Sequence, residues 1–333
     1  MHIRTLGKTG IKVFSVGIGT AGLGIMEHSD FLRVYVEKRV DLVDQGLGKA
    51  ALTRAISGLI AMAKAQGHKS GDARIVVDTA AFYEGRLSEK MIGEVLSAVP
   101  EFCPWVLVTT KVGQTLDGGV NYGHNHLAES LLKSSELVGV EKFEVVYLHD
   151  PMGLPEETVY SARKMLEAER WANHIGVAAN DPDTNEKYIA SSKFSVAVVP
   201  QAVSLLNTRI ERGILTHAAR HNTGLVAATV IERGLLSETP PMLDKIKAGR
   251  EFSAECVQHS WQIRMFCLQK GISINAAAIQ WPAWRYPEVA VSVVGIQNLQ
   301  QAEDLVRAAG IEIADELFRE LQPMVKHFDA KRI

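Results

Sequence analysis

Short apolar runs rich in valine and isoleucine recur along the chain, and longer segments with a helical pattern separate them. Within each run the apolar residues are nearly continuous and do not alternate with polar ones. This pattern indicates strands buried on both faces, as in a parallel sheet. We predict eight such strands, at residues 13–20, 74–80, 105–110, 143–149, 174–178, 196–200, 224–229 and 289–295.

The segments between these runs have apolar residues at helical spacing. After the third run, for example, Leu127, Leu131 and Val138 fall on one face. Strand and helix alternate about eight times without a composition break, so we predict a single domain over residues 1–333, an α/β fold of the (β/α)₈ TIM-barrel type. The alternative is an open, doubly wound sheet, but the glycines of GIGTAGLG (17–24) are in the wrong order for the dinucleotide fingerprint of that fold.

Some segments exceed the minimal barrel. The opening residues predict an N-terminal β-hairpin with its turn at Lys8-Thr9-Gly10. About fifty residues separate the first two predicted strands; a helix at 48–67 fills part of this gap, and residues 25–47 form an insertion or long loop. A second expansion, 233–255, contains Thr239-Pro240-Pro241 and is predicted to be a surface loop. We therefore expect expanded βα loops.

Composition and charge narrow the functional classes. The chain has 333 residues, of which 22% are charged and 47% hydrophobic, and its net charge is -2. Such a chain has no basic field for nucleic acid or an anionic membrane. Its three cysteines have no metal-ligand spacing and indicate reduced thiols. With no apparent signal peptide or membrane span, we expect a cytoplasmic protein; the pattern leaves its oligomeric state open.

Polar residues end several of the apolar runs. They are Asp78, Lys111 and His149, and Asn180 and Gln201 lie just past the next two runs. In a barrel, the loops at the carboxyl ends of the strands carry the chemistry, so these side chains are predicted to share one mouth.

Asp78 and Lys111 are predicted to pair, because a lone buried charge is unfavourable. One interpretation is a structural ion pair alone. The other includes Tyr83, whose pKa a neighbouring ammonium is expected to lower, so that the phenol exchanges a proton near neutral pH. His149 would then donate a hydrogen bond to a carbonyl or hydroxyl oxygen.

These residues lie in motifs that resemble those of the aldo-keto reductases. The segments DTAAFYEGRLSEKMIGEVL (78–96), TTKVG (109–113), VVYLHDP (145–151), IGVAAN (175–180) and VSVVGIQNLQQAEDL (291–305) follow the order of that family, as does the opening RTLGKTGIKVFSVGIGT (4–20). The resemblance implies that Tyr83 is the general acid/base, that Asp78 holds Lys111 beside it, and that His149 orients the substrate oxygen. It also implies a nicotinamide cofactor across the barrel mouth.

The resemblance further implies where the cofactor binds. Asn180 and Gln201 match positions that hold the nicotinamide carboxamide, and ERGLLS (232–237) resembles a pyrophosphate-contacting loop. The family usually has an aromatic residue before this loop, whereas here Val230 or Ile231 would make an aliphatic contact. The predicted cofactor residues are Gly19, Thr20, Asn180, Gln201, Val230, Ile231, Gly234, Leu235, Gly295, Gln297, Gln301 and Asp304.

Cofactor choice is predicted from the segment after Gly295. Members that use NADPH have a lysine or arginine there, but this chain has no cation until Arg307. Because a phosphate dianion binds poorly without a charged partner, we expect NAD, with NADP as the alternative. This absence and the VAATVIERGLLS loop (226–237) loosely resemble the galactose-type aldose dehydrogenase branch. Glu84 departs from the family pattern, in which glycine usually follows the tyrosine.

Substrate contacts are expected from the loops above the catalytic set. The candidate residues are Met26, Tyr122, His124, His126 and Met152. His124 and His126 have no third ligand at a matching spacing, so no metal is predicted.

The predicted function is that of an NAD(P)-dependent oxidoreductase, in EC class 1.1.1.-, that transfers a hydride between nicotinamide and a sugar or similar polyhydroxylated alcohol or carbonyl compound. The alternatives are an NADPH-dependent aldehyde or ketone reductase, a non-redox enzyme, and a cofactor-sensing module on the same fold. The expected partner is a small-molecule substrate, without nucleic acid or membrane.

Overall fold

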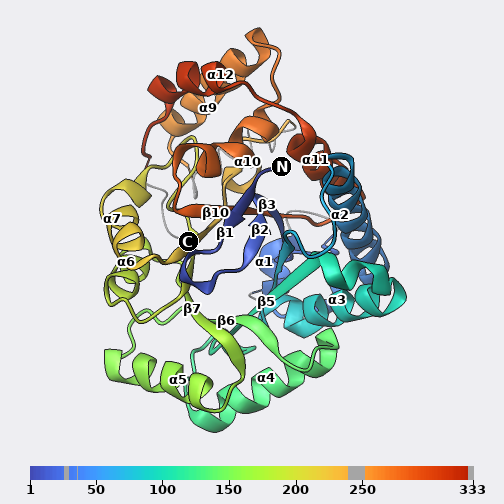
Figure 1. Cartoon of the computed structure of the whole chain (residues 1–333), viewed down its shortest axis with the longest axis vertical. Helices are drawn as coiled ribbons and strands as arrows, with labels where there is room; N and C mark the ends of the chain where they lie inside the picture. Colours follow the sequence, from blue (N-terminus) through green and yellow to red (C-terminus); the bar gives the residue numbers. More distant parts are fainter. Residues whose placement is uncertain (26–29, 36, 239–251, 329–333) are drawn as a thin grey trace.

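The computed structural model describes residues 1–25, 30–35, 37–238 and 252–328. Its centre is a closed barrel of parallel strands in the order β10-β3-β4-β5-β6-β7-β8-β9, surrounded by helices (Figure 1). The barrel strands are β3 (Val16–Gly19), β4 (Ile75–Asp78), β5 (Val106–Val112), β6 (Phe143–His149), β7 (Ala172–Ala178), β8 (Val196–Pro200), β9 (Gly224–Ala228) and β10 (Val289–Gly295). The predicted TIM-barrel fold is thus confirmed.

The eight predicted apolar runs correspond to the eight barrel strands, with one difference in the first run. Residues 13 and 14 of that run belong to β2 (Lys12–Phe14), a strand outside the barrel. Ser15 marks the change, because its N–H donates to the carbonyl of His2 at 2.8 Å while its own carbonyl accepts from Ser292 of β10 at 2.9 Å. The chain therefore leaves the hairpin and enters the barrel at one residue.

The predicted N-terminal hairpin is also confirmed. Strand β1 (Ile3–Thr5) pairs antiparallel with β2, and the pair lies across the centre of the ring of helices in Figure 1. Its turn packs closely on the first residue of β9: a Cβ on Gly7, whose φ is +51°, would lie 2.1 Å from the amide nitrogen of Gly224. Leu6 and Val13 join the cluster inside the barrel. The hairpin therefore packs at the amino ends of the strands.

Side chains alternate between two hydrophobic clusters along the barrel strands. Val76 of β4 belongs to the inner cluster, whereas its neighbours Ile75 and Val77 belong to the outer cluster between barrel and helices. The inner face is tightly filled, since a Cβ on Gly176 would lie 2.5 Å from the ring of Tyr147. Burial on both faces explains why the sequence runs are continuously apolar.

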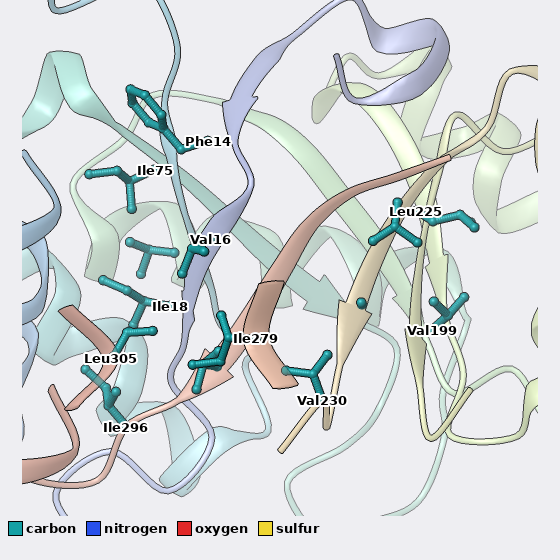
Figure 2. Packing of buried hydrophobic residues seen from close by; sticks show 14 of the residues in the cluster. Phe14, Val16, Ile18, Ile75, Val199, Leu225, Val230, Ile279, Ile296 and Leu305 are labelled. Carbon is teal, nitrogen blue, oxygen red and sulfur yellow. The ribbon is translucent and has the colours of Figure 1, made fainter. Parts of the chain in front are cut away.

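Helices cover the outer face of the barrel. Figure 2 shows part of this layer, in which Ile18 of β3 lies near Ile296 and Leu305. The predicted faces were correct: Leu127, Leu131 and Val138 are buried. The helices are α1 (Asp30–Tyr35), α2 (Gln45–Ala65), α3 (Leu87–Ala98), α4 (His124–Val138), α5 (Glu156–Ala168), α6 (Pro182–Ala190), α7 (Ile214–His221), α9 (Ala254–Gln269), α10 (Ile274–Arg285), α11 (Leu299–Gly310) and α12 (Asp315–Leu321).

The two predicted expansions differ in how much of them the structure describes. The first contains α1 and a short 3₁₀ helix at Val40–Leu42, followed by α2, which begins after the capping residue Asp44. The predicted loop at Thr239-Pro240-Pro241 lies outside the described residues. None of the helices in the described ranges has the length and apolar character needed to cross a membrane.

Candidate active site

Strand alternation brings Asp78, Lys111 and His149 to the inner side of the barrel. Each lies an even number of residues beyond a member of the inner cluster on the same strand, toward the carboxyl end. The three inner residues used for this comparison are Val76, Leu107 and Tyr147. The predicted mouth residues therefore share one end of the barrel interior.

Asp78 and Lys111 form a buried ion pair. Their side chains come from neighbouring strands, Nζ of Lys111 lies 2.5 Å from Oδ2 of Asp78, and the residues are 3% and 4% exposed, respectively. The Thr109 hydroxyl donates to the other carboxylate oxygen at 2.9 Å, and Nζ also donates to the carbonyl of Thr79 at 3.0 Å. Both charges are thus compensated by partners as well as by each other.

Tyr83 completes the cluster from the turn after β4. Its phenol oxygen lies 3.1 Å from Nζ of Lys111, and the ammonium lies 4.7 Å from the centre of its ring. The ring also meets the imidazole of His149 edge-on, with centroids 6.1 Å apart. The structure therefore brings all four predicted catalytic residues together.

The expected lowering of the Tyr83 pKa is wrong. Burial raises the pKa of Tyr83, and the opposing charge of Lys111 does not overcome it. Burial alone would lower the pKa of Lys111, but Asp78 and Tyr83 reverse this, so its pKa is raised. The cluster accordingly pairs a protonated phenol with a stable ammonium.

His149 is held as a neutral imidazole. Burial and then the charge of Lys111 place its pKa well below the ordinary value. Its Nδ1 is buried and has no hydrogen-bond partner among the residues that the structure describes. Its backbone carbonyl accepts from the hydroxyl of Tyr122 at 2.9 Å. A neutral imidazole has one N–H donor, which suits it to holding an uncharged oxygen.

The predicted cofactor residues divide into exposed and buried groups. Gly19 and Gly295 pair at the ends of β3 and β10, where neither has a side chain to obstruct a ligand. Thr20, by contrast, is fully buried and donates to the carbonyl of Asp78 at 3.0 Å. Val230 and Leu235 are also buried, in the outer hydrophobic cluster. These three residues therefore present almost no surface to a ligand.

Two polar residues after β7 and β8 occupy turns at the mouth. Asn180 is exposed, and its backbone N–H and side-chain amide donate to the carboxylate of Asp150 at 3.3 and 3.4 Å. Gln201 has a left-handed φ of 54°, and its carbonyl accepts from Asn207 at 2.8 Å. Both positions remain accessible enough to meet a ligand.

The segment after β10 carries more acidic than basic groups. Gln297 donates its backbone N–H to the side chain of Gln301 at 2.8 Å. Asp304 forms an ion pair with Arg307, and Glu303 lies 3.4 Å from Arg54 of α2. The cations here are thus already matched to carboxylates. Ile231 and Gly234, in the loop after β9, are partly exposed.

The predicted substrate residues are not all at one site. Tyr122 is buried and supports His149 as described above, and Met152 is 52% exposed in the loop after β6. His124 contacts Glu169 beyond α5, on the surface. His126 has a buried Nε2 with no partner in the described ranges. Met26 lies outside the described residues, and no cluster of metal-ligating side chains occurs in the part of the chain that the structure describes.

Two residues beside the cluster were missed as site residues. Tyr35, at the end of α1, meets Tyr83 edge-on with centroids 6.5 Å apart, and its hydroxyl bonds to the carboxyl group of Glu84. Burial raises the pKa of Glu84 to about 8. The one signal in the sequence was Glu84 itself, at a position where glycine was expected. The insertion at residues 25–47 therefore contacts the cluster of predicted catalytic residues through Tyr35.

Known proteins resemble this chain in sequence and in fold. The model of the aldo/keto reductase family matches residues 60–326, well over half of the chain. The chain is 26% identical to D-threo-aldose 1-dehydrogenase of a Pseudomonas species, over 73% of this chain and 82% of that protein. It is 25% identical to L-galactose dehydrogenase of Arabidopsis thaliana, over 92% and 88%. A Klebsiella pneumoniae aldo/keto reductase solved with NADP and acetate matches with a TM-score of 0.67, at 16% identity over 99% of this chain and 97% of that chain.

Proposed function

Because the chain belongs to the aldo/keto reductase family, whose members are oxidoreductases, we propose that it transfers a hydride between a nicotinamide cofactor and a sugar or a similar polyhydroxylated alcohol or carbonyl compound. One observation carries the proposal. The hydroxyl of Tyr83 lies 3.1 Å from the ammonium of Lys111, which Asp78 holds in place, at the carboxyl ends of the barrel strands. This is the geometry of a proton donor and acceptor beside a reacting oxygen.

The residues at the mouth fit a nicotinamide dinucleotide. Gly19 and Gly295 allow a ligand to approach the backbone, and the amide groups of Asn180 and Gln201 offer hydrogen bonds of the kind a carboxamide needs. The buried Nδ1 of His149 has no hydrogen-bond partner among the described residues, so it is free to bond a ligand. When bound, the cofactor supplies or accepts the hydride.

The protein's own residues then handle the proton and the substrate oxygen. Tyr83 gives its hydroxyl proton to a carbonyl oxygen in reduction and recovers one from an alcohol in oxidation. Lys111 stabilises the phenolate that this exchange leaves, because its charge lies at hydrogen-bond distance. His149, being neutral, holds the same oxygen by hydrogen bonding without competing for the proton.

The substrate class is supported by two relatives named for sugar oxidation, the D-threo-aldose and L-galactose dehydrogenases. Polar groups of the mouth loops, including the exposed Asn180 and the carboxylate of Asp150, suit a ligand with several hydroxyl groups.

For the cofactor we propose NAD. Between Gly295 and Gly310 the only cation of the sequence is Arg307, and it pairs with Asp304. A 2′-phosphate would therefore meet carboxylates rather than free cations. The alternative, an NADPH-dependent reductase of aldehydes or ketones, is supported by the raised pKa of Tyr83, which favours a proton donor. The NADP bound to the Klebsiella protein is a further reason to test both cofactors.

Titration of the purified protein with NADH and with NADPH, followed by tryptophan fluorescence, tests the proposal. We expect binding of both, with NADH tighter, and hydride transfer from aldoses such as L-galactose to NAD measured by nicotinamide absorbance. Tighter binding of NADPH with carbonyl reduction would favour the alternative. Binding of neither cofactor would contradict the proposed oxidoreductase activity.

A further inference from the structure

We propose that Glu84, together with Tyr35, forms a polar subsite beside Tyr83 that binds one hydroxyl group of the substrate and so selects polyhydroxylated substrates. The inference rests on the function proposed above and adds the residues that determine its specificity. Neither residue belongs to the four-residue cluster, and Tyr35 lies before residue 60, where the match to the family model begins.

The carboxyl group of Glu84 is fixed on one side only. The residue is 1% exposed, and Oε1 accepts from the backbone N–H of Gly22 at 2.6 Å and from the hydroxyl of Tyr35. The other oxygen, Oε2, is buried and has no hydrogen-bond partner among the described residues. Buried polar atoms normally have partners, so an orphaned carboxyl oxygen next to an active site indicates a partner that arrives with a ligand.

The backbone at this position lies in the left-handed region. Glu84 has a φ of 46° and is followed by Gly85 and Arg86 at 59° and 75°. Left-handed conformations are unfavourable for a residue with a long side chain, and glycine would adopt this one freely. Strain of this kind is commonly found at functional sites. A glutamate at a position that glycine would occupy without strain is thus consistent with a role for its carboxyl group.

Glu84 and Tyr35 also border a cavity. Its volume is about 250 Å³, and its lining includes Phe82 and Lys38 as well as these two residues. Nζ of Lys38 lies 4.8 Å from the centre of the Phe82 ring and donates to the carbonyl of Tyr35 at 2.7 Å. Tyr35 both lines this cavity and contacts Tyr83 edge-on. Tyr35 thus connects this cavity with the ring of Tyr83.

The chemistry of the orphaned oxygen favours a hydroxyl group as its partner. Burial raises the pKa of Glu84 to about 8, so the carboxyl group is mostly protonated near neutral pH. A protonated carboxyl group offers one O–H donor and keeps acceptor capacity, which matches a hydroxyl group that also donates and accepts. An anionic substrate group would gain less here, because a second negative charge would have to be buried close to the carboxyl group.

The experiment compares kcat/KM for L-galactose and its 2-, 3-, 4- and 6-deoxy analogues in four proteins: the wild type, Glu84→Gly, Glu84→Asn and Glu84→Gln. In the wild type we expect removal of one particular hydroxyl to lower kcat/KM about tenfold, as for a lost buried hydrogen bond. In Glu84→Gly that penalty should fall to less than about twofold while those at the other positions persist. Glu84→Asn shortens the side chain by one methylene group, which moves its polar group away from the position of Oε2. Asparagine tolerates the left-handed conformation, so this variant gives the same test if the glycine variant does not fold.

Glu84→Gln is the matched control. Its amide retains a donor and an acceptor in nearly the same place, and we expect the penalty to persist. Titration with NADH and thermal unfolding check that each variant is folded and binds cofactor. If the wild type oxidises aldoses and all deoxy penalties are the same in the four proteins, the subsite is wrong and the proposed function stands. If the wild type acts on no aldose, the sugar-oxidising function is wrong and the subsite with it.

Discussion

The ammonium of Lys111 lies 3.1 Å from the hydroxyl of Tyr83 while it binds the carboxylate of Asp78 at 2.5 Å. One charge thus has two partners, a carboxylate and a phenol. Because burial raises the pKa of Tyr83, the lysine matters most once the phenol has lost its proton. Variants of Tyr83, Lys111 and Asp78 separate the chemical role of this cluster from its structural role.

Replacing Tyr83 with phenylalanine should remove the proton donor and little else. We expect kcat/KM to fall by at least about 10²-fold, the lower end of the usual contribution of general acid–base catalysis. NADH affinity, measured by fluorescence titration, should stay within about twofold, because the ring and its contact with His149 remain. Turnover like that of the wild type would remove Tyr83 from the role assigned to it.

Replacing Lys111 with methionine should affect both activity and stability. Asp78 is 4% exposed and would be left as a buried charge without its counter-ion, so the free energy of unfolding should fall by about 3–5 kcal/mol in urea titrations. Activity should fall about as far as in Tyr83→Phe.

The double variant Asp78→Asn/Lys111→Met is the control for this pair. It removes both charges, so most of the stability should return while activity stays low. Asp78→Asn alone completes the cycle. If its stability loss and that of Lys111→Met simply add in the double variant, the pair is not coupled as its geometry indicates.

Glu84 should make the protein less stable as the pH rises. Its pKa in the folded protein is about 8, against an ordinary 4.5, so between these values the folded state binds more protons than the unfolded state. The stability of the wild type relative to Glu84→Gln should therefore be greatest below about pH 4.5 and fall toward pH 8. The slope is at most about 1.4 kcal/mol per pH unit.

Unfolding by urea between pH 5 and 8.5 measures this difference. Glu232, whose pKa burial raises to about 7, titrates in the same range, but it is present in both proteins and cancels from the comparison. A stability difference that is constant over this range would mean that Glu84 is ionised throughout.

Cofactor preference should respond to one added charge after β10. Gln297→Arg places a guanidinium in the segment where the sequence otherwise has no cation before Arg307. We expect NADPH to bind about tenfold tighter, with NADH little changed, and the gain to shrink at high salt because the added contact is ionic. An equal gain in affinity for both cofactors would mean that the 2′-phosphate of NADPH does not contact residue 297.

Much of the barrel could be predicted because it follows from local pattern. Strands buried on both faces are continuously apolar, and three of the predicted strands, 143–149, 196–200 and 289–295, have the observed bounds. The meeting of Asp78, Lys111 and His149 was also predictable, since parallel strands bring their carboxyl ends together.

The remaining features depend on burial and on contacts between distant segments. The sequence predicts a lysine beside Tyr83, which lowers the pKa of the phenol. Only the folded structure shows that Tyr83 is buried deeply enough for burial to outweigh this effect. Val230 precedes a predicted cofactor loop, yet its side chain turns into the outer hydrophobic cluster, as Figure 2 shows. Tyr35 lies in an insertion without periodicity, so only the folded chain reveals its contact with Tyr83.

The pairing of β3 with β10 has a consequence for how the protein is made. Val16 lies beside Ser292 in this seam, so nearly the whole chain must leave the ribosome before the barrel can close. Gly19 and Gly295 end the same seam. A dinucleotide that contacts both would bind only the closed ring and, by mass action, would protect newly completed molecules from reopening along it.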